Sequence, residues 1–92
     1  MDSIEHCLRK LARTYPDNDT FTQMAHLIKR SSRRQYLFVN DIIKDRERTK
    51  ALVAAAQKAL TPMELARFKT YLIDLYTAHD TPLTLFEVAM RL

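Results

Sequence analysis

Histidine and cysteine side chains are the first candidates for chemistry in this chain of 92 residues. The three histidines are His6, His26 and His79, and the single cysteine, Cys7, directly follows His6. Adjacent side chains point in different directions on a helix, and no spacing typical of a zinc site is present. We therefore expect no metal site, and we expect structural or surface roles for the histidines.

Motifs that would indicate catalysis are missing from the sequence. The chain contains no glycine, so it has no Gly-rich phosphate-binding loop, and it has no HExxH, GxSxG or paired-carboxylate arrangement. Its Asp and Glu residues fall mostly at expected helix caps and exposed faces. The sequence predicts neither an enzyme nor a cofactor.

A basic cluster in the run KRSSRR is the sharpest charged feature, and it consists of Lys29, Arg30, Arg33 and Arg34. Together with the neighbouring Tyr36, it could contact phosphates or an acidic segment of a partner protein. It could equally be a solvated loop whose charges interact favourably with the C-terminal dipole of the preceding helix. No helix-turn-helix signature and no alternation of Arg with aromatic residues accompanies it, so we do not expect specific base recognition.

Length, charge and cysteine content narrow the class of protein. Ninety-two residues suffice for one domain with a single core. The net charge of +4 is uneven: residues 1–50 hold 11 Lys/Arg and 7 Asp/Glu, whereas residues 51–92 hold 4 of each. This bias permits an acidic partner or nucleic acid, but it is also ordinary for solubility. One cysteine, no signal-peptide pattern and no apolar run of about 20 residues predict a soluble intracellular protein, cytoplasmic or nuclear, without a membrane span.

The best-specified element that could position these groups is the run LTPMELARFKTYLIDLY at residues 60–76. Thr61 can cap a helix, Pro62 suits its first position, and Glu64 completes a capping box. An apolar stripe recurs at helical spacing and has further apolar residues beside it, which predicts a central helix of a bundle. The stripe consists of Leu65, Phe68, Leu72, Leu75 and Tyr76, with Ala66, Tyr71 and Ile73 flanking it.

Four helices are expected before this one. The first spans residues 2–14 and is capped by Asp2, and the second follows the polar turn at residues 16–19 and ends near Lys29 or Arg30. A capping box of Ser32 and Gln35 opens the third, and Asp45 caps the fourth, which runs through Ala59.

The third of these segments is ambiguous, since residues 36–39 also have strand propensity. No second strand is available to pair with it, so the sequence favours a short buried helix. Its buried side chains are expected to be Leu37, Phe38, Ile42 and Ile43.

A sixth helix is predicted after Thr81 and Pro82, which repeat the pairing of a cap with proline. It is apolar nearly all round, so it is either buried on several sides or covered by something outside this chain. Three of its residues, together with Tyr71 and Ile73, could supply more apolar surface than a six-helix core can cover, and the surplus would form a groove or a dimer seam. Alternatively, all of these residues belong to the core. The three residues are Phe86, Met90 and Leu92.

The pattern LxxxYxxxDT occurs twice, beginning at Leu11 and at Leu72. In both copies an apolar helix is expected to follow, which indicates two αα-hairpins. The hairpins would occupy residues 1–30 and 60–92, joined by helices over residues 32–59. The repetition arises either from internal duplication or from chance in a helical protein with two polar turns.

The run ALVAAAQKALTPMELARFKTYLIDLYTAHDTPLTLFEVAMRL resembles the opening helices of harmonin-homology domains: a short helix, Leu-Thr, a helix with Phe, Leu and Tyr, a polar turn and an apolar helix. The earlier run CLRKLARTYPDNDTFTQMAHLIKRSSRRQYLFVNDIIKDRERTKAL is similar to the part of these domains that starts at the Tyr-ended helix. The order departs from a single domain, because the first copy lacks most of its opening helix and the second lacks its last two helices. Members of the family are small helical bundles that bind peptides or partner proteins and are not enzymes, and the resemblance implies the same here.

The sequence therefore predicts an all-α, compact bundle of five to six short helices forming one domain over residues 1–92. Its expected function is non-catalytic: an adaptor or regulatory module that binds a peptide or helix of another protein in a hydrophobic groove with a basic rim. The alternative is a small nucleic-acid-associated regulator, and a homo-oligomer through the C-terminal helix is a third possibility. The expected partner-binding residues are Lys29, Arg30, Arg33, Arg34, Tyr36, Tyr71, Ile73, Phe86 and Met90.

Overall fold

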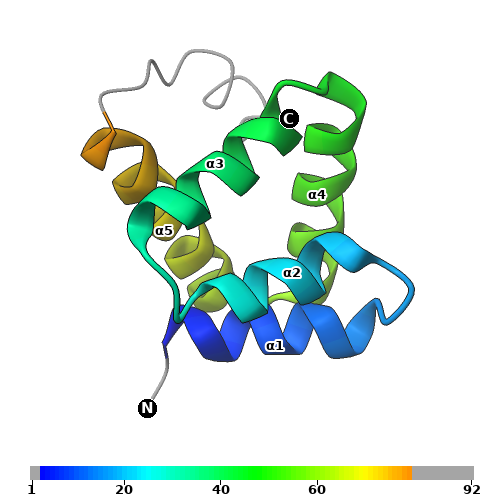
Figure 1. Cartoon of the computed structure of the whole chain (residues 1–92). Helices are drawn as coiled ribbons and strands as arrows, with labels where there is room; N and C mark the ends of the chain where they lie inside the picture. The colour runs from blue at the N-terminus through cyan, green and yellow to red at the C-terminus, as the bar shows by residue number, and fades with distance from the viewer. Residues whose placement is uncertain (1–2, 80–92) are drawn as a thin grey trace.

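Five α-helices follow one another in residues 3–79, the part of the chain that the computed structural model describes (Figure 1). They are α1 (Ile4–Thr14), α2 (Asp19–Leu27), α3 (Ser32–Ile43), α4 (Arg46–Ala59) and α5 (Pro62–Ala78). The described residues contain no strand, which confirms the predicted all-α class and the helical assignment of the ambiguous third segment. The predicted sixth helix, with Phe86 and Met90, lies outside the described residues.

Side-chain caps start each helix. Asp45 caps α4 by accepting from the backbone N–H groups of Glu47 and Arg48, as predicted. The capping box of α5 is also confirmed: the N–H of Glu64 donates to Thr61 Oγ1 at 3.2 Å, and the N–H of Thr61 donates to Glu64 Oε1 at 2.9 Å.

Two predicted caps are wrong by one residue. Ser3, not Asp2, caps α1 by accepting from the N–H of His6, and Ser31, not Ser32, caps α3 by accepting from the N–H of Arg34. Asp2 and Ser3 are both of residue types that cap helices, and Ser31 and Ser32 are identical, so residue type alone does not separate the neighbours. The second helix also ends earlier than predicted, at Leu27, because the chain turns there before α3.

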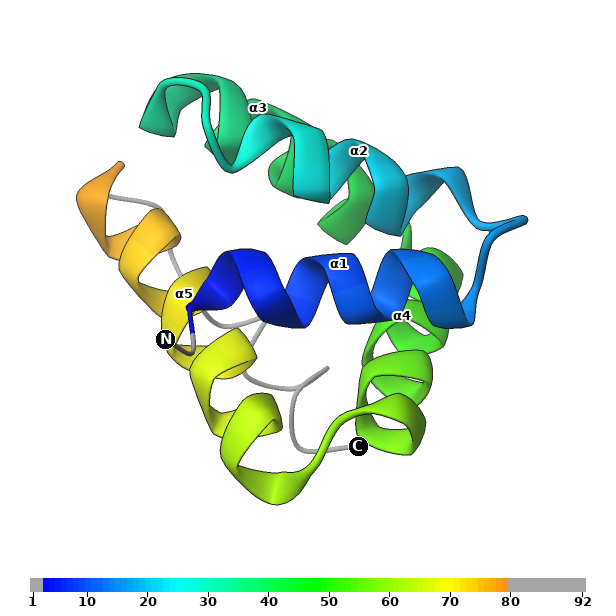
Figure 2. The same cartoon turned by 90° about the horizontal axis from the view of Figure 1, so that it is seen from below.

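The helices enclose one hydrophobic core. Helices α1 and α2 lie side by side and run in opposite directions, and α4 and α5 pass at the two ends of α1 (Figure 2). Each helix contributes apolar side chains at helical spacing, and burying them is the main source of stability. The buried apolar core contains Cys7, Leu8, Leu11, Phe21, Met24, Val39, Ile42, Ile43, Leu52, Ala56, Leu60, Phe68, Leu72, Leu75 and Tyr76.

One core prediction on α3 is wrong. Leu37 was expected to be buried, but it is 50% exposed, and Val39 takes an interior position instead. The reason is the orientation of α3, which turns Tyr36 and Val39 toward the core. Leu37 follows Tyr36 directly, so its side chain points about 100° away around the helix axis. The expected burial of Ile42 and Ile43 is confirmed, and Phe38 is only partly buried against the core.

The helix ends at different positions of the LxxxYxxxDT pattern in its two copies. Helix α1 stops at Thr14, so that Tyr15 is its C-terminal cap, whereas α5 continues through Tyr76 to Ala78. The first copy forms an αα-hairpin of α1 and α2, as expected. The second helix of the second copy lies outside the described residues.

Candidate functional site

A surface groove of about 490 Å³ runs along α5 beside the start of α1, and we call it the α5 groove. Its α5 residues occupy positions i, i+3, i+4, i+7, i+8 and i+11, so they share one face of that helix. Between the first and the last of them the helix rises about 16 Å. The lining consists of Ser3, which caps α1, and Ile4 of α1, with Met63, Ala66, Arg67, Thr70, Tyr71 and Asp74 from α5.

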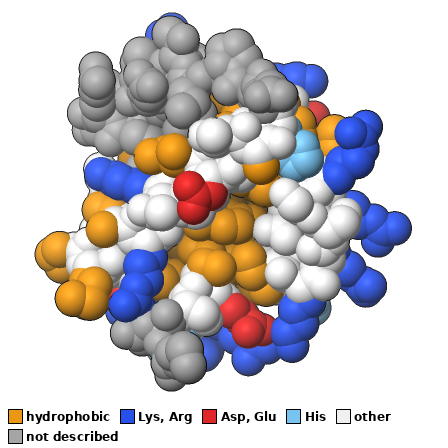
Figure 3. All heavy atoms as spheres, turned by 90° about the vertical axis from the view of Figure 1, so that its left-hand side faces the viewer, with side chains coloured by type: hydrophobic (Ala, Val, Ile, Leu, Met, Phe, Trp, Pro, Cys, Tyr) orange, Lys and Arg blue, Asp and Glu red, His pale blue; other side chains and the backbone are white. Residues whose placement is uncertain are grey.

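The groove combines an exposed apolar end with small residues in its middle. Met63 is 66% exposed, the largest exposed fraction among the large apolar side chains that the structure describes as exposed. Ala66 and Thr70 are exposed as well, and their short side chains leave the helix surface open. Figure 3 shows the side of the molecule on which α5 lies, where hydrophobic side chains gather with Lys, Arg, Asp and Glu side chains around them.

Tyr71 connects the wall of the α5 groove to the basic cluster. Its hydroxyl donates to Gln35 Oε1 at 2.8 Å, and Gln35 Nε2 donates to the carbonyl oxygen of Arg30 at 2.9 Å. Burial raises the pKa of Tyr71 to about 12, so the hydroxyl keeps its proton and remains a donor at neutral pH. Two side chains thus hold the turn between α2 and α3 against α5.

The basic cluster lies on the surface, as the sequence suggested. All four cations are exposed, and Lys29 Nζ lies 3.5 Å from Glu5 Oε1, which Arg9 also contacts at 3.0 Å. Within residues 3–79, Arg30, Arg33 and Arg34 make no ion pair. Their charges therefore face solvent at the start of α3, the helix that Gln35 joins to Tyr71 of α5.

Tyr36 lies beside the cluster but turns toward α5. Its ring stacks on that of His79 with centroids 4.5 Å apart and meets the ring of Tyr76 edge-on at 5.3 Å. Ser32 Oγ approaches His79 Nε2 at 3.1 Å, so the start of α3 and the end of α5 are joined at this corner. The half-buried ring of Tyr36 is thus engaged within the chain.

The remaining expected site residues divide into two groups. Ile73 is 43% exposed but does not line the α5 groove, whereas Tyr71 does. Phe86 and Met90 lie outside the described residues. Met63, Arg67 and Asp74 were not among the predicted site residues, because the residues predicted on this helix came from the apolar stripe and its flanks. The spacing of these three residues along another face was the available signal.

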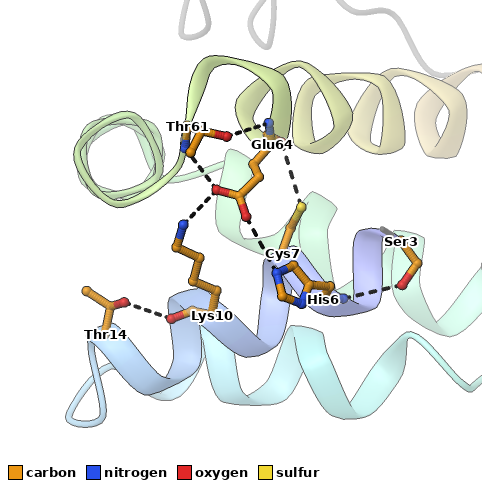
Figure 4. A network of polar contacts seen from close by, with 7 residues as sticks. All are labelled: Ser3, His6, Cys7, Lys10, Thr14, Thr61 and Glu64. Atoms are coloured by element: carbon orange, nitrogen blue, oxygen red, sulfur yellow. Dashed lines mark hydrogen bonds and ion pairs between the residues drawn. The ribbon is translucent and has the colours of Figure 1, made fainter. Parts of the chain in front are cut away.

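A network around Glu64 fixes the two walls of the groove to each other (Figure 4). Glu64 Oε1 accepts from Lys10 Nζ at 2.7 Å, and Glu64 Oε2 lies 3.6 Å from His6 Nε2. The hydrogen bond from Lys10, followed by that from the backbone of Thr61, lowers the pKa of Glu64 to about 2. The Cys7 thiol adds a weak hydrogen bond to the Glu64 carbonyl oxygen at 3.8 Å.

Residues 3–79 contain no group of three or more His, Cys, Asp or Glu side chains that could hold a metal ion. None of the described helices has the length and apolar character needed to cross a membrane. Comparison of the chain with protein-family models, curated proteins and solved structures found no match.

Proposed function

We propose that this chain is a non-catalytic protein-interaction module that binds a helix of a partner protein in the α5 groove. The observation that carries the proposal is the groove itself: one continuous face of α5, open along three turns, with a large exposed apolar side chain at one end. The resemblance to harmonin-homology domains favours the same kind of function.

The dimensions of the groove favour a helical partner. A partner helix of about 11 residues matches its length of about 16 Å. Ala66 and Thr70 allow the axis of such a helix to approach closely, and the flexible side chain of Met63 can adapt to apolar residues of the partner. The face of α5 would then bury apolar area that is exposed in the free chain.

The basic cluster supports the proposal of a basic rim. Arg30, Arg33 and Arg34 have no ion pair in residues 3–79, and Gln35 ties their turn to the groove residue Tyr71. Exposed charges of one sign increase the association rate of oppositely charged partners and select against others. We therefore propose that the partner helix carries acidic residues at the end that reaches this rim.

The test compares two substitutions that place the same charge at different exposed apolar positions. Met63→Glu lies in the groove, and Leu37→Glu, at a site that is 50% exposed on α3, lies outside it. Proteins captured by the immobilised wild-type chain are quantified by mass spectrometry, and binding is then measured with synthetic peptides from them by fluorescence anisotropy. We expect helical peptides that lose about tenfold or more of their affinity for Met63→Glu and keep it for Leu37→Glu. Equal binding to both variants would overturn the proposal.

A second candidate rests on Arg30, Arg33 and Arg34, which have no ion pair within residues 3–79 and could contact nucleic-acid phosphates. Phosphate binding releases counterions, so the affinity for duplex or single-stranded DNA would fall steeply between two salt concentrations. Triple charge reversal of Arg30, Arg33 and Arg34 separates the candidates. It would abolish DNA binding if phosphates are the ligand, but it would leave residual apolar binding of a partner helix in the α5 groove.

A further inference from the structure

We infer that the α5 groove takes α5 of a second copy of this chain, in an antiparallel pair around a twofold axis. The inference rests on the proposed function, because it uses the same groove and names the helix that occupies it. The observation behind it is the charge pattern of the groove face: in two antiparallel copies of this face, opposite charges lie opposite each other.

The two charged groove residues have opposite signs and lie seven positions apart. Arg67 and Asp74 are therefore separated by about 10.5 Å along the helix axis, which places them two turns apart on the same face. Asp74 is exposed, and it makes no ion pair with another residue of the described part of the chain. Asp74 can therefore meet a cation on a second helix, and the several N–H donors of the Arg67 guanidinium allow it to add a contact there to those within its own chain.

An antiparallel pair brings these charges together twice. When the twofold axis passes between Thr70 and Tyr71, Arg67 lies opposite the partner's Asp74, and symmetry repeats the contact with the roles exchanged. A parallel pair in register would instead place like charges opposite each other, which is unfavourable. The charge pattern thus selects one orientation.

The uncharged residues of the face suit the same arrangement. Thr70 lies next to the axis, and together with Ala66 it keeps side-chain bulk low on its side of the axis. Tyr71, on the other side, directs its hydroxyl away to Gln35 on α3. Met63, exposed at the start of α5, then lies opposite the small side chain of the partner's Ala78. The pair would cover Met63 without burying an isolated charge at its centre.

Sedimentation equilibrium over a range of protein concentrations tests the inference. The intact chain is expected to form a dimer. Arg67→Asp and Asp74→Arg each replace two attractions by two repulsions, so each is expected to raise the dimer dissociation constant about tenfold or more. The double variant, which exchanges the two charges, is expected to restore dimerisation.

Mixing the two single variants gives the sharpest result. The Arg67→Asp chain then presents two aspartates to two arginines of the Asp74→Arg chain, so two chains that associate poorly alone are expected to form a heterodimer. Lys58→Asp and Asp41→Arg make the same charge changes at exposed sites on α4 and α3, and they serve as matched controls that keep the dimer. Circular dichroism of each variant checks that it remains helical.

Two results would overturn the inference: a wild-type chain that stays monomeric at millimolar concentration, or single variants that dimerise like the wild type. Neither result decides the proposed function, because binding of other proteins is measured separately with Met63→Glu and Leu37→Glu. A groove that binds peptides in a strictly monomeric chain would support the module and exclude the self-pairing.

Discussion

Lys10 Nζ lies 2.7 Å from Glu64 Oε1, and this ion pair joins the middle of α1 to the first turn of α5. The same carboxylate oxygen accepts the N–H of Thr61, so one side chain both caps α5 and connects it to α1. Because the two helices are the walls of the α5 groove, the shape of the groove depends on this contact.

Acid should weaken the fold through Glu64. Its pKa is about 2 in the folded chain, below its ordinary value of 4.5. A lowered folded-state pKa means that the stabilisation is present above about pH 4.5 and is lost as the pH falls toward 2. We expect Glu64→Gln to remove this part of the pH dependence, as measured by urea unfolding between pH 2 and 6. Glu47→Gln, on the exposed start of α4, is the control. A Glu64→Gln curve parallel to that of the wild type over this range would contradict the assignment.

Removal of the α5 cap should destabilise the chain directly. Thr61→Ala eliminates the oxygen that accepts the N–H of Glu64, and losing such a cap costs about 0.5–2 kcal/mol of unfolding free energy. Thr77→Ala, an exposed site in the last turns of the same helix, should change stability much less. Chemical denaturation monitored by circular dichroism measures both, and equal losses would argue against the capping role.

Two apolar residues of α5 should respond very differently to truncation. Phe68 is 0% exposed in the core, and Phe68→Ala is expected to cost about 3–5 kcal/mol. Ile73 is 43% exposed, and Ile73→Ala should stay within about 1 kcal/mol. Urea midpoints of the two variants test the orientation of α5, and a larger loss for Ile73→Ala would mean that the helix buries another face.

The hydrogen bond from Tyr71 to Gln35 should appear as a coupling between α5 and α3. Tyr71→Phe removes the donor and is expected to cost about 0.5–1.5 kcal/mol of unfolding free energy. Gln35→Ala removes the acceptor, so the double variant should lose less than the sum of the two single losses. Strictly additive losses would show that the two side chains do not interact in solution.

The raised pKa of Tyr71 offers an independent measurement. The tyrosinate absorbance of the wild-type chain should contain a component that titrates near pH 12, caused by burial of this hydroxyl, and burial also raises the pKa of Tyr76. Tyr71→Phe should remove that component while the other tyrosines continue to titrate. If the absorbance change near pH 12 were as large in the variant as in the wild type, Tyr71 would not be its source.

Local chemistry determined most of the helices in advance. Asp45, and Thr61 with Pro62 and Glu64, can each be recognised from spacing alone because a cap acts over three residues. The apolar stripe of α5 likewise identified Phe68 and Leu72 as core, since a period of 3.6 residues places them on one side of the helix.

Only the tertiary structure decided which surfaces remain open. Two adjacent serines were equally able to cap α3, and the choice of Ser31 leaves Ser32 to meet His79. The exposure of Leu37 depends on how α3 packs against α5. Met63, Arg67 and Asp74 form a groove because the start of α1 lies beside α5, a contact between residues about 60 positions apart that no local pattern encodes.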